Sequence, residues 1–209
     1  MIRSISYASC YVYSPIGAGE LCEKSRLLRT FLKTGDAVFM RKYAGRVRRE
    51  AAASAPLAGF FEPTDLLVPV PGSAPYSAAD PWTSQRLAAA LVDEGLGGAA
   101  WTGLQRARAV RKSATAAPGR RPTVGLHYDS FYVEPPLEPP AGIVLIDDVI
   151  TKGRTLLAAA SRLHEAFPDA RIRAFALLRT MGLISAIENL LCPCKGQIRW
   201  KGGDAHRSP

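Results

Sequence analysis

The residues best suited to chemistry lie in one continuous stretch, and two of them are adjacent acids. Asp147 and Asp148 follow four aliphatic residues, Ile143 to Ile146, which predict a central parallel strand covered on both faces. Open α/β sheets bind ligands in the crevice beyond the carboxyl ends of their strands. Carboxylates placed there can accept hydrogen bonds from sugar hydroxyls and hold a hydrated Mg²⁺ nearby. The stretch therefore predicts a polar binding site at the end of this strand.

The residues that follow the acids indicate a phosphate site. Thr151 to Thr155 combine hydroxyl side chains with Gly153 immediately ahead of a predicted helix. Backbone N–H groups at a helix N-terminus bind phosphate, helped by the helix dipole. A phosphate cradle beside two carboxylates suits a sugar phosphate. The acids alone would also fit a turn followed by a helix cap, which is common in α/β proteins; the whole run favours the ligand site.

A basic segment separates this site from an earlier strand. No acid occurs between Gly95 and Tyr128, and the cations there are Arg106, Arg108, Arg111, Lys112, Arg120 and Arg121. The segment has little periodicity and contains Pro118-Gly119, so we expect a mobile loop. It could act as a lid over an anionic ligand, as a solvated linker or as a contact for nucleic acid.

The composition is that of an ordinary globular protein with an excess of positive charge. The chain has 209 residues, of which 47% are hydrophobic, and its net charge is +9. A second basic run extends from Arg41 to Arg49, so the surface is expected to attract polyanions. No apolar run approaches 18 residues, and the N-terminus lacks the apolar block of a signal peptide. We therefore expect a cytoplasmic protein without a membrane contact.

The cysteines and one histidine leave alternatives open. Four cysteines could form one zinc site, but only Cys192 and Cys194 are closely spaced, and they lack the two-residue gap of a zinc knuckle. Buried or free thiols are the favoured interpretation. His127 could face a base or act in acid–base chemistry, although an ordinary packed histidine is the simpler reading.

Strand and helix patterns alternate along the chain, which predicts an α/β fold with a mostly parallel sheet. Strands are expected at 5–13, 65–71, 99–104, 128–133, 143–146 and 171–178. Helices are expected at 23–33, 36–53, 81–94 with Asp80 as the cap, from the end of the glycine loop to 167, and at 183–191. We divide the chain into an N-terminal extension or hood (1–60), a main domain (61–191) and a basic, glycine-rich tail (192–209) that is partly disordered.

Residues 143–155 resemble the PRPP-binding signature of the type I phosphoribosyltransferases. That signature has four hydrophobic residues, two acids, two hydrophobic residues and a Thr/Ser-Gly-x-Thr loop; Lys152 stands where a small or hydroxyl residue is usual. The order of Pro69-Val70-Pro71, basic loop and acid pair is most similar to the ComF branch, over residues 65–180. The N-terminal zinc finger of that branch is missing, since only Cys10 and Cys22 precede residue 65.

The resemblance implies a type I phosphoribosyltransferase-like parallel sheet flanked by helices and an Mg²⁺-dependent transfer of phosphoribosyl from PRPP to a nitrogen of a base or amine, with release of pyrophosphate. Asp147 and Asp148 would hold the ribose hydroxyls and Mg²⁺ through water. The 5′-phosphate would contact Thr151, Lys152, Gly153, Arg154 and Thr155, and Val149 would also belong to the PRPP site. The pyrophosphate would border Val70, Pro71, Gly72 and Ser73. Cations of the lid would neutralise the leaving group, namely Arg106, Arg108 and Lys112.

A second hypothesis comes from a different functional class. The fold could serve as a catalytically silent adaptor or regulator that binds PRPP, nucleic acid or a protein partner in DNA metabolism, as the ComF resemblance implies. The net charge of +9 and the acid-free segment favour this reading. A homodimer is compatible with either hypothesis.

Overall fold

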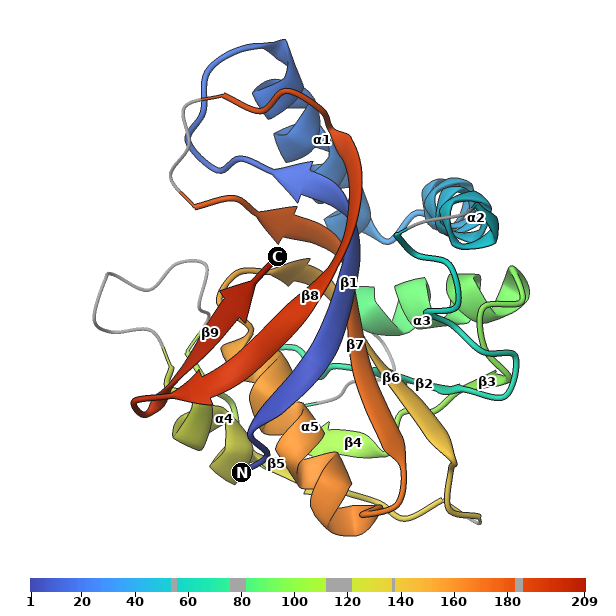
Figure 1. Ribbon diagram of the computed structural model, residues 1–209, viewed down its shortest axis with the longest axis vertical. Helices are drawn as coiled ribbons and strands as arrows, with labels where there is room; N and C mark the ends of the chain where they lie inside the picture. The colour runs from blue at the N-terminus through green and yellow to red at the C-terminus, as the bar shows by residue number, and fades with distance from the viewer. Residues whose placement is uncertain (54–55, 76–81, 112–121, 137, 183–185) are drawn as a thin grey trace.

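The computed structural model describes residues 1–53, 56–75, 82–111, 122–136, 138–182 and 186–209. Its main sheet contains the strands β1 (Ser4–Tyr13), β2 (Leu66–Pro69), β3 (Ala99–Ala100), β6 (Gly142–Ile150), β7 (Arg171–Thr180), β8 (Leu191–Lys201) and β9 (Asp204–Ser208). The strand order is β3-β2-β6-β7-β1-β8-β9 (Figure 1). From β3 to β1 all neighbours are parallel, and β8 and β9 are added antiparallel. The expectation of a mostly parallel sheet is confirmed.

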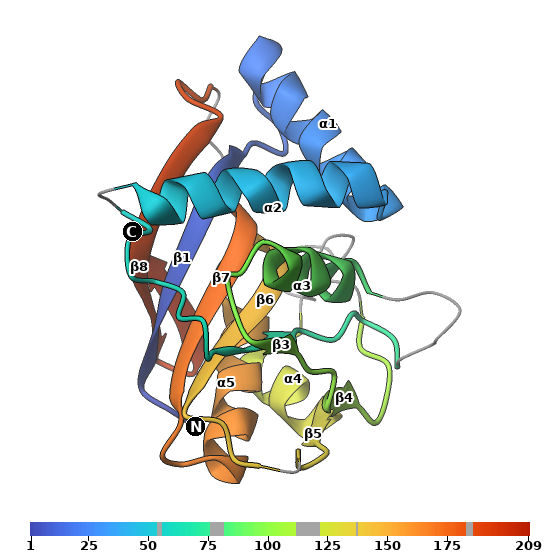
Figure 2. The same cartoon turned by 90° about the vertical axis from the view of Figure 1, so that its right-hand side faces the viewer.

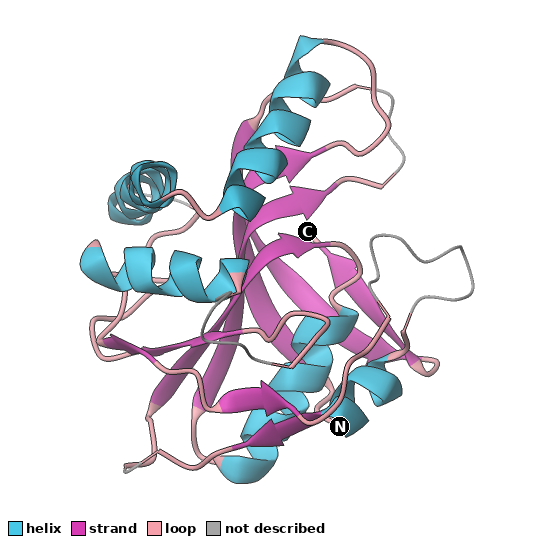
Figure 3. Ribbon diagram, turned by 180° about the vertical axis from the view of Figure 1, so that it is seen from behind, coloured by secondary structure: helices cyan, strands magenta, loops and turns pink. Residues whose placement is uncertain are grey.

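Helices cover both faces of this sheet. They are α1 (Glu20–Thr34), α2 (Ala37–Ala52), α3 (Thr83–Asp93), α4 (Val124–Ser130) and α5 (Arg154–Ala166). In Figure 2, α1, α2 and α3 lie together on one side, while α4 and α5 lie near the separate two-stranded antiparallel sheet of β4 (Leu104–Arg106) and β5 (Phe131–Val133). Figure 3 shows the strands of the main sheet running between these helices. The chain therefore folds as an α/β structure with the sheet in the middle.

Strand β6 divides the apolar interior into two cores because its side chains point alternately to opposite faces. Ile143 and Leu145 belong to the core beneath α5, and Val144 and Ile146 belong to the core beneath α1, α2 and α3. All four side chains are fully buried. This explains why the strand is aliphatic without a polar alternate, as expected for a parallel strand with both faces covered.

The last segment corrects the expectation of a partly disordered tail. Residues 191–201 and 204–208 form β8 and β9, and β8 pairs with β1. Gly202 and Gly203 have φ of 59° and 81°, the left-handed values that a two-residue type I′ hairpin turn requires. Ile198 and Ala205 are buried in the α5-side core. The N-terminal strand, the main segment and the C-terminal hairpin thus share one sheet.

Other element boundaries also differ from the sequence expectations. Residues 186–190 are not helical and Leu191 begins β8, where the backbone pairs with β1; residues 183–185 lie outside the described residues. The expected strand at 128–133 is a helix up to Ser130, because the Thr123 side chain caps it at the N–H of Leu126. The strand expected at 99–104 is divided between β3 and β4. Helix α3 begins at Thr83, whereas Asp80 and Pro81 lie outside the described residues.

A buried ion pair joins the start of β2 to β7. Arg173 Nη2 lies 2.5 and 2.6 Å from the two carboxylate oxygens of Asp65, and its Nη1 donates to the Phe60 carbonyl at 2.5 Å. The Asp65 side chain is 1% exposed and that of Arg173 is 9% exposed. The pair ties the segment that follows α2 to the centre of the sheet.

No helix in the described part of the chain combines the length and the apolar character that a membrane crossing requires.

Asp65→Ala is expected to lower the free energy of unfolding by about 3–5 kcal/mol, because it leaves the buried Arg173 guanidinium without its counter-ion. Urea denaturation followed by circular dichroism measures this change. Glu62→Gln is the matched control, since it removes the partner of the exposed Arg171 on the same strand and should leave the midpoint unchanged. An unchanged midpoint for Asp65→Ala would contradict the role given to the pair.

Candidate active site

Three segments that are far apart in the sequence meet at the carboxyl edge of the sheet. The N–H of Val70, just after β2, donates to the carbonyl of Ile146 in β6 at 2.8 Å. The N–H of Val110, beyond β4, donates to the carbonyl of Ser73 at 2.8 Å. The loop after β2, the acid pair on β6 and the start of the basic segment are therefore neighbours, as the sequence argument requires for one site.

The acid pair lies where β6 leaves the core. Both side chains are half-buried, and Asp147 Oδ1 accepts a hydrogen bond from the backbone N–H of Asp148 at 2.8 Å. Burial, together with the adjacent Asp148 carboxylate, raises the pKa of Asp147 well above its usual range. Two adjacent, partly desolvated carboxylates are stabilised by a cation or by a hydrogen-bond donor that binds to them.

Helix α1 supplies a cation that the sequence analysis did not identify. Lys33 Nζ forms a salt bridge with Asp148 Oδ2. The Lys33 side chain is 47% exposed, whereas that of Asp148 is only 13% exposed. Lys33 looked like one of several polar residues on an amphipathic helix, and nothing in its local sequence distinguishes it. The contact brings α1, part of the expected hood, to the site.

The loop between β6 and α5 is shaped by one glycine. Gly153 is the N-cap of α5 and has a φ of 85°, a left-handed conformation that L side chains rarely adopt. A Cβ at this position would also lie 2.8 Å from the Ile198 side chain of β8. The first turn of α5 follows directly, and its N–H groups lack helical acceptors. This geometry suits an anion, as the sequence predicted.

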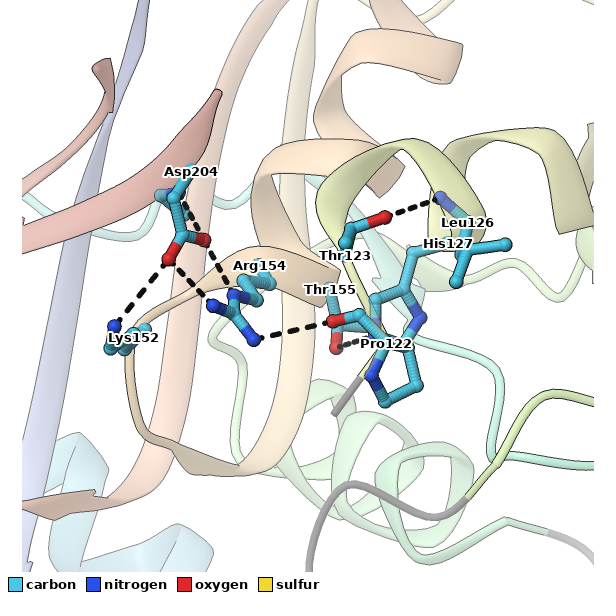
Figure 4. A network of polar contacts seen from close by, with 9 residues as sticks. Pro122, Thr123, Leu126, His127, Lys152, Arg154, Thr155 and Asp204 are labelled. Carbon is cyan, nitrogen blue, oxygen red and sulfur yellow. Dashed lines mark hydrogen bonds and ion pairs between the residues drawn. The ribbon is translucent and has the colours of Figure 1, made fainter. Parts of the chain in front are cut away.

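The two cations of this loop are turned toward β9 (Figure 4). Arg154 binds Asp204 through two contacts, Nε to Oδ1 at 2.5 Å and Nη2 to Oδ2 at 2.6 Å. Lys152 Nζ lies 3.4 Å from the same carboxylate. These partners, Arg154 first, lower the pKa of Asp204 well below its usual range. Asp204 was missed because the segment was read as a tail; its hairpin signal, Gly202-Gly203, was present in the sequence.

Arg106 does not lie in an exposed lid, which corrects that expectation. It is in β4, is 4% exposed, and its guanidinium stands 4.1 Å over the Phe131 ring. Its Nε donates to the carbonyl of Gly72 at 2.5 Å, and its Nη1 donates to Ser130 Oγ. Burial lowers the pKa of Arg106 to about 10. Arg106 is therefore a positioning residue, which holds the loop after β2 through the Gly72 carbonyl.

His127 continues this network to the phosphate loop (Figure 4). Arg106 Nη2 lies 3.2 Å from His127 Nδ1, and His127 Nε2 lies 3.4 Å from Thr155 Oγ1. Arginine can only donate, so Nδ1 accepts and the ring proton resides on Nε2. Burial, followed by the charges of Arg106 and Arg154, lowers the pKa of His127 to about 4. His127 is thus a packed, neutral histidine whose ring links two of the expected binding loops.

The remaining expected residues vary in their exposure. Pro71 is buried, Gly72 and Ser73 are half-buried, and the carbonyl of Val70 accepts from the buried Ser84 hydroxyl at 2.7 Å. Thr151 and Arg108 are exposed. Val149 packs against the core beneath α1, α2 and α3. Lys112, and with it most of the expected lid, lies outside the described residues.

In the part of the chain that the structure describes, the four cysteines do not form one cluster. Cys10 and Cys22 are buried, and burial raises the pKa of Cys10 to about 12. Cys194 Sγ lies 3.3 Å from Ser9 Oγ, and Cys192 packs near Cys22. Among the described residues, no group of three or more His, Cys, Asp or Glu side chains is arranged to hold a metal ion.

Comparison with known proteins adds no family to this description: no family model matches the chain, and no curated protein matches it.

The low pKa of His127 should make folding pH-dependent. Between pH 6.5 and about 4, the unfolded chain binds a proton that the folded His127 does not, so the free energy of unfolding falls as the pH decreases through this window. The loss attributable to His127 is roughly 3 kcal/mol. His127→Asn, which removes the titrating ring, should show a correspondingly smaller decrease in urea denaturation at stepped pH. Identical pH slopes for the two proteins would contradict the assignment.

Proposed function

We propose that the chain binds PRPP at the carboxyl edge of β2 and β6 and transfers its phosphoribosyl group to a nitrogen nucleophile. The observation that carries the proposal is the convergence of three segments at that edge. The acid pair lies in the last part of β6, the left-handed Gly153 caps α5 shortly after that strand, and Val70, at the start of the Val70–Ser73 loop, hydrogen-bonds to Ile146 next to the acid pair. Carboxylates suit ribose hydroxyls, and the helix start suits the 5′-phosphate.

In this proposal the ribose hydroxyls, the 5′-phosphate and the pyrophosphate of the ligand each contact a different set of protein groups. Asp147 and Asp148 accept hydrogen bonds from the 2′- and 3′-hydroxyls, and Lys33 balances the charge of Asp148. The backbone from Thr151 to Thr155 receives the 5′-phosphate. The Thr155 oxygen accepts from His127, so its own hydroxyl hydrogen is available for a phosphate oxygen. Gly72 and Ser73 border the pyrophosphate.

The residues present fit a magnesium ion brought with the substrate. The adjacent carboxylates are hard oxygen donors, and burial together with the neighbouring Asp148 carboxylate raises the pKa of Asp147, so a cation beside the pair would favour its ionised form. Asp147 and Asp148 would hold the ion through water, because Mg²⁺ keeps several of its waters. The chemistry it supplies is charge neutralisation on the pyrophosphate.

The reaction is a substitution at C1′ of the ribose. The bond from C1′ to the pyrophosphate oxygen breaks and its electron pair leaves with pyrophosphate. A bond from the nucleophile's nitrogen to C1′ forms, and that nitrogen passes a proton to solvent water. The protein's own contribution is to hold the two ends of the ribose 5-phosphate, so that C1′ faces the acceptor. The exposed Arg108, two residues before the Val110 N–H that donates to Ser73, supplies positive charge near the leaving group.

One observation favours a second candidate, a PRPP-binding regulator that performs no transfer. All three guanidinium nitrogens of Arg106, the basic residue that contacts the Val70–Ser73 loop directly, hydrogen-bond inside the protein. Pyrophosphate release in a screen of bases and amines separates the candidates: release with any acceptor identifies a transferase, and PRPP binding without release identifies the regulator.

The double variant Asp147→Asn/Asp148→Asn should bind PRPP with Mg²⁺ at least about 100-fold more weakly than the wild type, because it removes two charged acceptors of the ribose hydroxyls. Calorimetric titration measures the affinity directly. Removing Mg²⁺ with a chelator should also weaken binding to the wild type.

Asp169→Asn provides the matched control, since this exposed acid precedes β7 at the opposite edge of the sheet. It should bind PRPP as the wild type does. Near-normal affinity in the double variant, with its fold intact by circular dichroism, would refute the proposed site.

A further inference from the structure

The outer face of α2 carries a groove of about 560 Å³ that the proposed function does not use. Four basic side chains line it, namely those of Arg41, Lys42, Arg48 and Arg49. The opposite face of the helix is accounted for by packing, because Met40, Ala44 and Val47 are buried in the core that α1, α2 and α3 cover. The basic residues on the outer face are therefore not needed for packing of the core.

The charges of the groove are mostly uncompensated. Glu94 is the acid that lines it among the described residues, and its Oε2 lies 3.7 Å from Arg48 Nη1. Arg46, on the same helix, pairs instead with Glu50 at 2.8 Å. The described lining thus holds four cations and one carboxylate, which pairs with Arg48. Like charges held this closely on one surface cost free energy that a bound anion would offset.

The spacing of the cations distinguishes an extended anion from a compact one. Arg41 and Arg48 are seven residues apart, as are Lys42 and Arg49, which separates each pair by about 10.5 Å along the helix axis. A single phosphate group needs donors that converge on one point. A track of cations two helical turns long instead suits a chain of regularly spaced phosphates.

The lining also argues against a protein partner. Protein interfaces are centred on buried aromatic or large apolar anchors, and Val38 is the largest apolar side chain that lines this groove. The described residues that line the groove include no aromatic side chain, so this lining offers no ring on which a base could stack. The contact that remains is electrostatic and independent of base sequence.

We propose that the α2 groove binds the phosphodiester backbone of a nucleic acid. The groove lies between α2 and the end of α3, whereas the acid pair is contacted by the end of α1, so the two sites use different residues. In Figure 2, α2 crosses above α3 and its length is not covered by other helices. Nucleic-acid binding here does not depend on PRPP binding.

The test is fluorescence anisotropy of a labelled 20-nucleotide strand and of the corresponding duplex, measured at several salt concentrations with the full chain. If four cations neutralise four phosphates, log K falls with log salt with a slope of about −2.8 for a single strand and about −3.6 for a duplex. For the strand, this means about 50-fold weaker binding at 200 mM than at 50 mM salt. The two slopes show which form of the backbone is bound.

The groove variant Arg41→Gln/Lys42→Gln/Arg48→Gln/Arg49→Gln should lose this affinity and most of the slope. Its control removes four exposed cations elsewhere, as Arg3→Gln/Lys24→Gln/Arg199→Gln/Lys201→Gln, and so has the same net charge. The control should bind nearly as the wild type does. Equal losses in both variants would show that net charge alone attracts the nucleic acid, and this would overturn the proposal.

A second variant, which is expected to strengthen binding, tests the proposal even if the groove variant fails to fold. Glu94→Gln removes the carboxylate of the groove and should strengthen binding severalfold at low salt. An unchanged or weaker affinity in Glu94→Gln, or no binding of either nucleic acid at 50 mM salt, would also overturn the proposal.

Discussion

The structure depends on the complete burial of Ile143 to Ile146, in the first part of β6, between β2 and β7. From Ile143 to Ile146 the side chains enter two different cores alternately, so neither face of this stretch tolerates a polar group. Charged residues can follow only where the strand reaches the edge of the sheet. Asp147 and Asp148 occur at that point, and Gly153 turns the chain into α5 five residues later. The position of the candidate site is therefore a consequence of how the centre of the sheet is packed.

Buried arginines hold distant segments against this centre. Arg173 joins β7 to Asp65, and Arg106 joins β4 to the carbonyl of Gly72 and to the hydroxyl of Ser130. All three nitrogens of Arg106 and both Nη atoms of Arg173 are hydrogen-bonded, whereas the buried Nε of Arg173 has no partner among the described residues. The bonds that do form offset the cost of removing a guanidinium from water, which is several kcal/mol. Through these bonds each arginine holds the segments that it contacts in place. At the candidate site, this places the loop after β2 at a constant position relative to β6 and His127.

The ends of the candidate site carry opposite charges that are balanced from outside the β6–α5 loop. Lys33 of α1 neutralises part of the acid pair, and Asp204 of β9 binds Arg154 and Lys152. The N-terminal and C-terminal segments therefore both contribute to the electrostatics of a site whose sequence signature lies between them. A sugar phosphate would replace some of these contacts with its own hydroxyls and phosphate oxygens.

The sequence alone determined the features that depend on neighbouring residues. The aliphatic run predicted the central strand, the alternation of elements predicted the parallel sheet, and the acids and glycine predicted where polar groups would gather, because local patterns specify strand, turn and helix start. The predicted ends of elements were wrong where helix and strand signals were of similar strength. At Thr123, for example, the side-chain cap begins a helix that continues into the first residues of an expected strand. The Gly202-Gly203 turn was readable but was overlooked within a glycine-rich tail.

Only the tertiary structure decided which charges meet. Arg106 and Arg108 are two residues apart and look equivalent in the sequence, yet one is buried beneath Gly72 and the other is exposed. Lys33 and Asp148 come from opposite halves of the chain. Arg154 and Asp204 likewise come from helix α5 and strand β9. Electrostatic partners are set by distance in space, and that distance is fixed by how the sheet orders its strands.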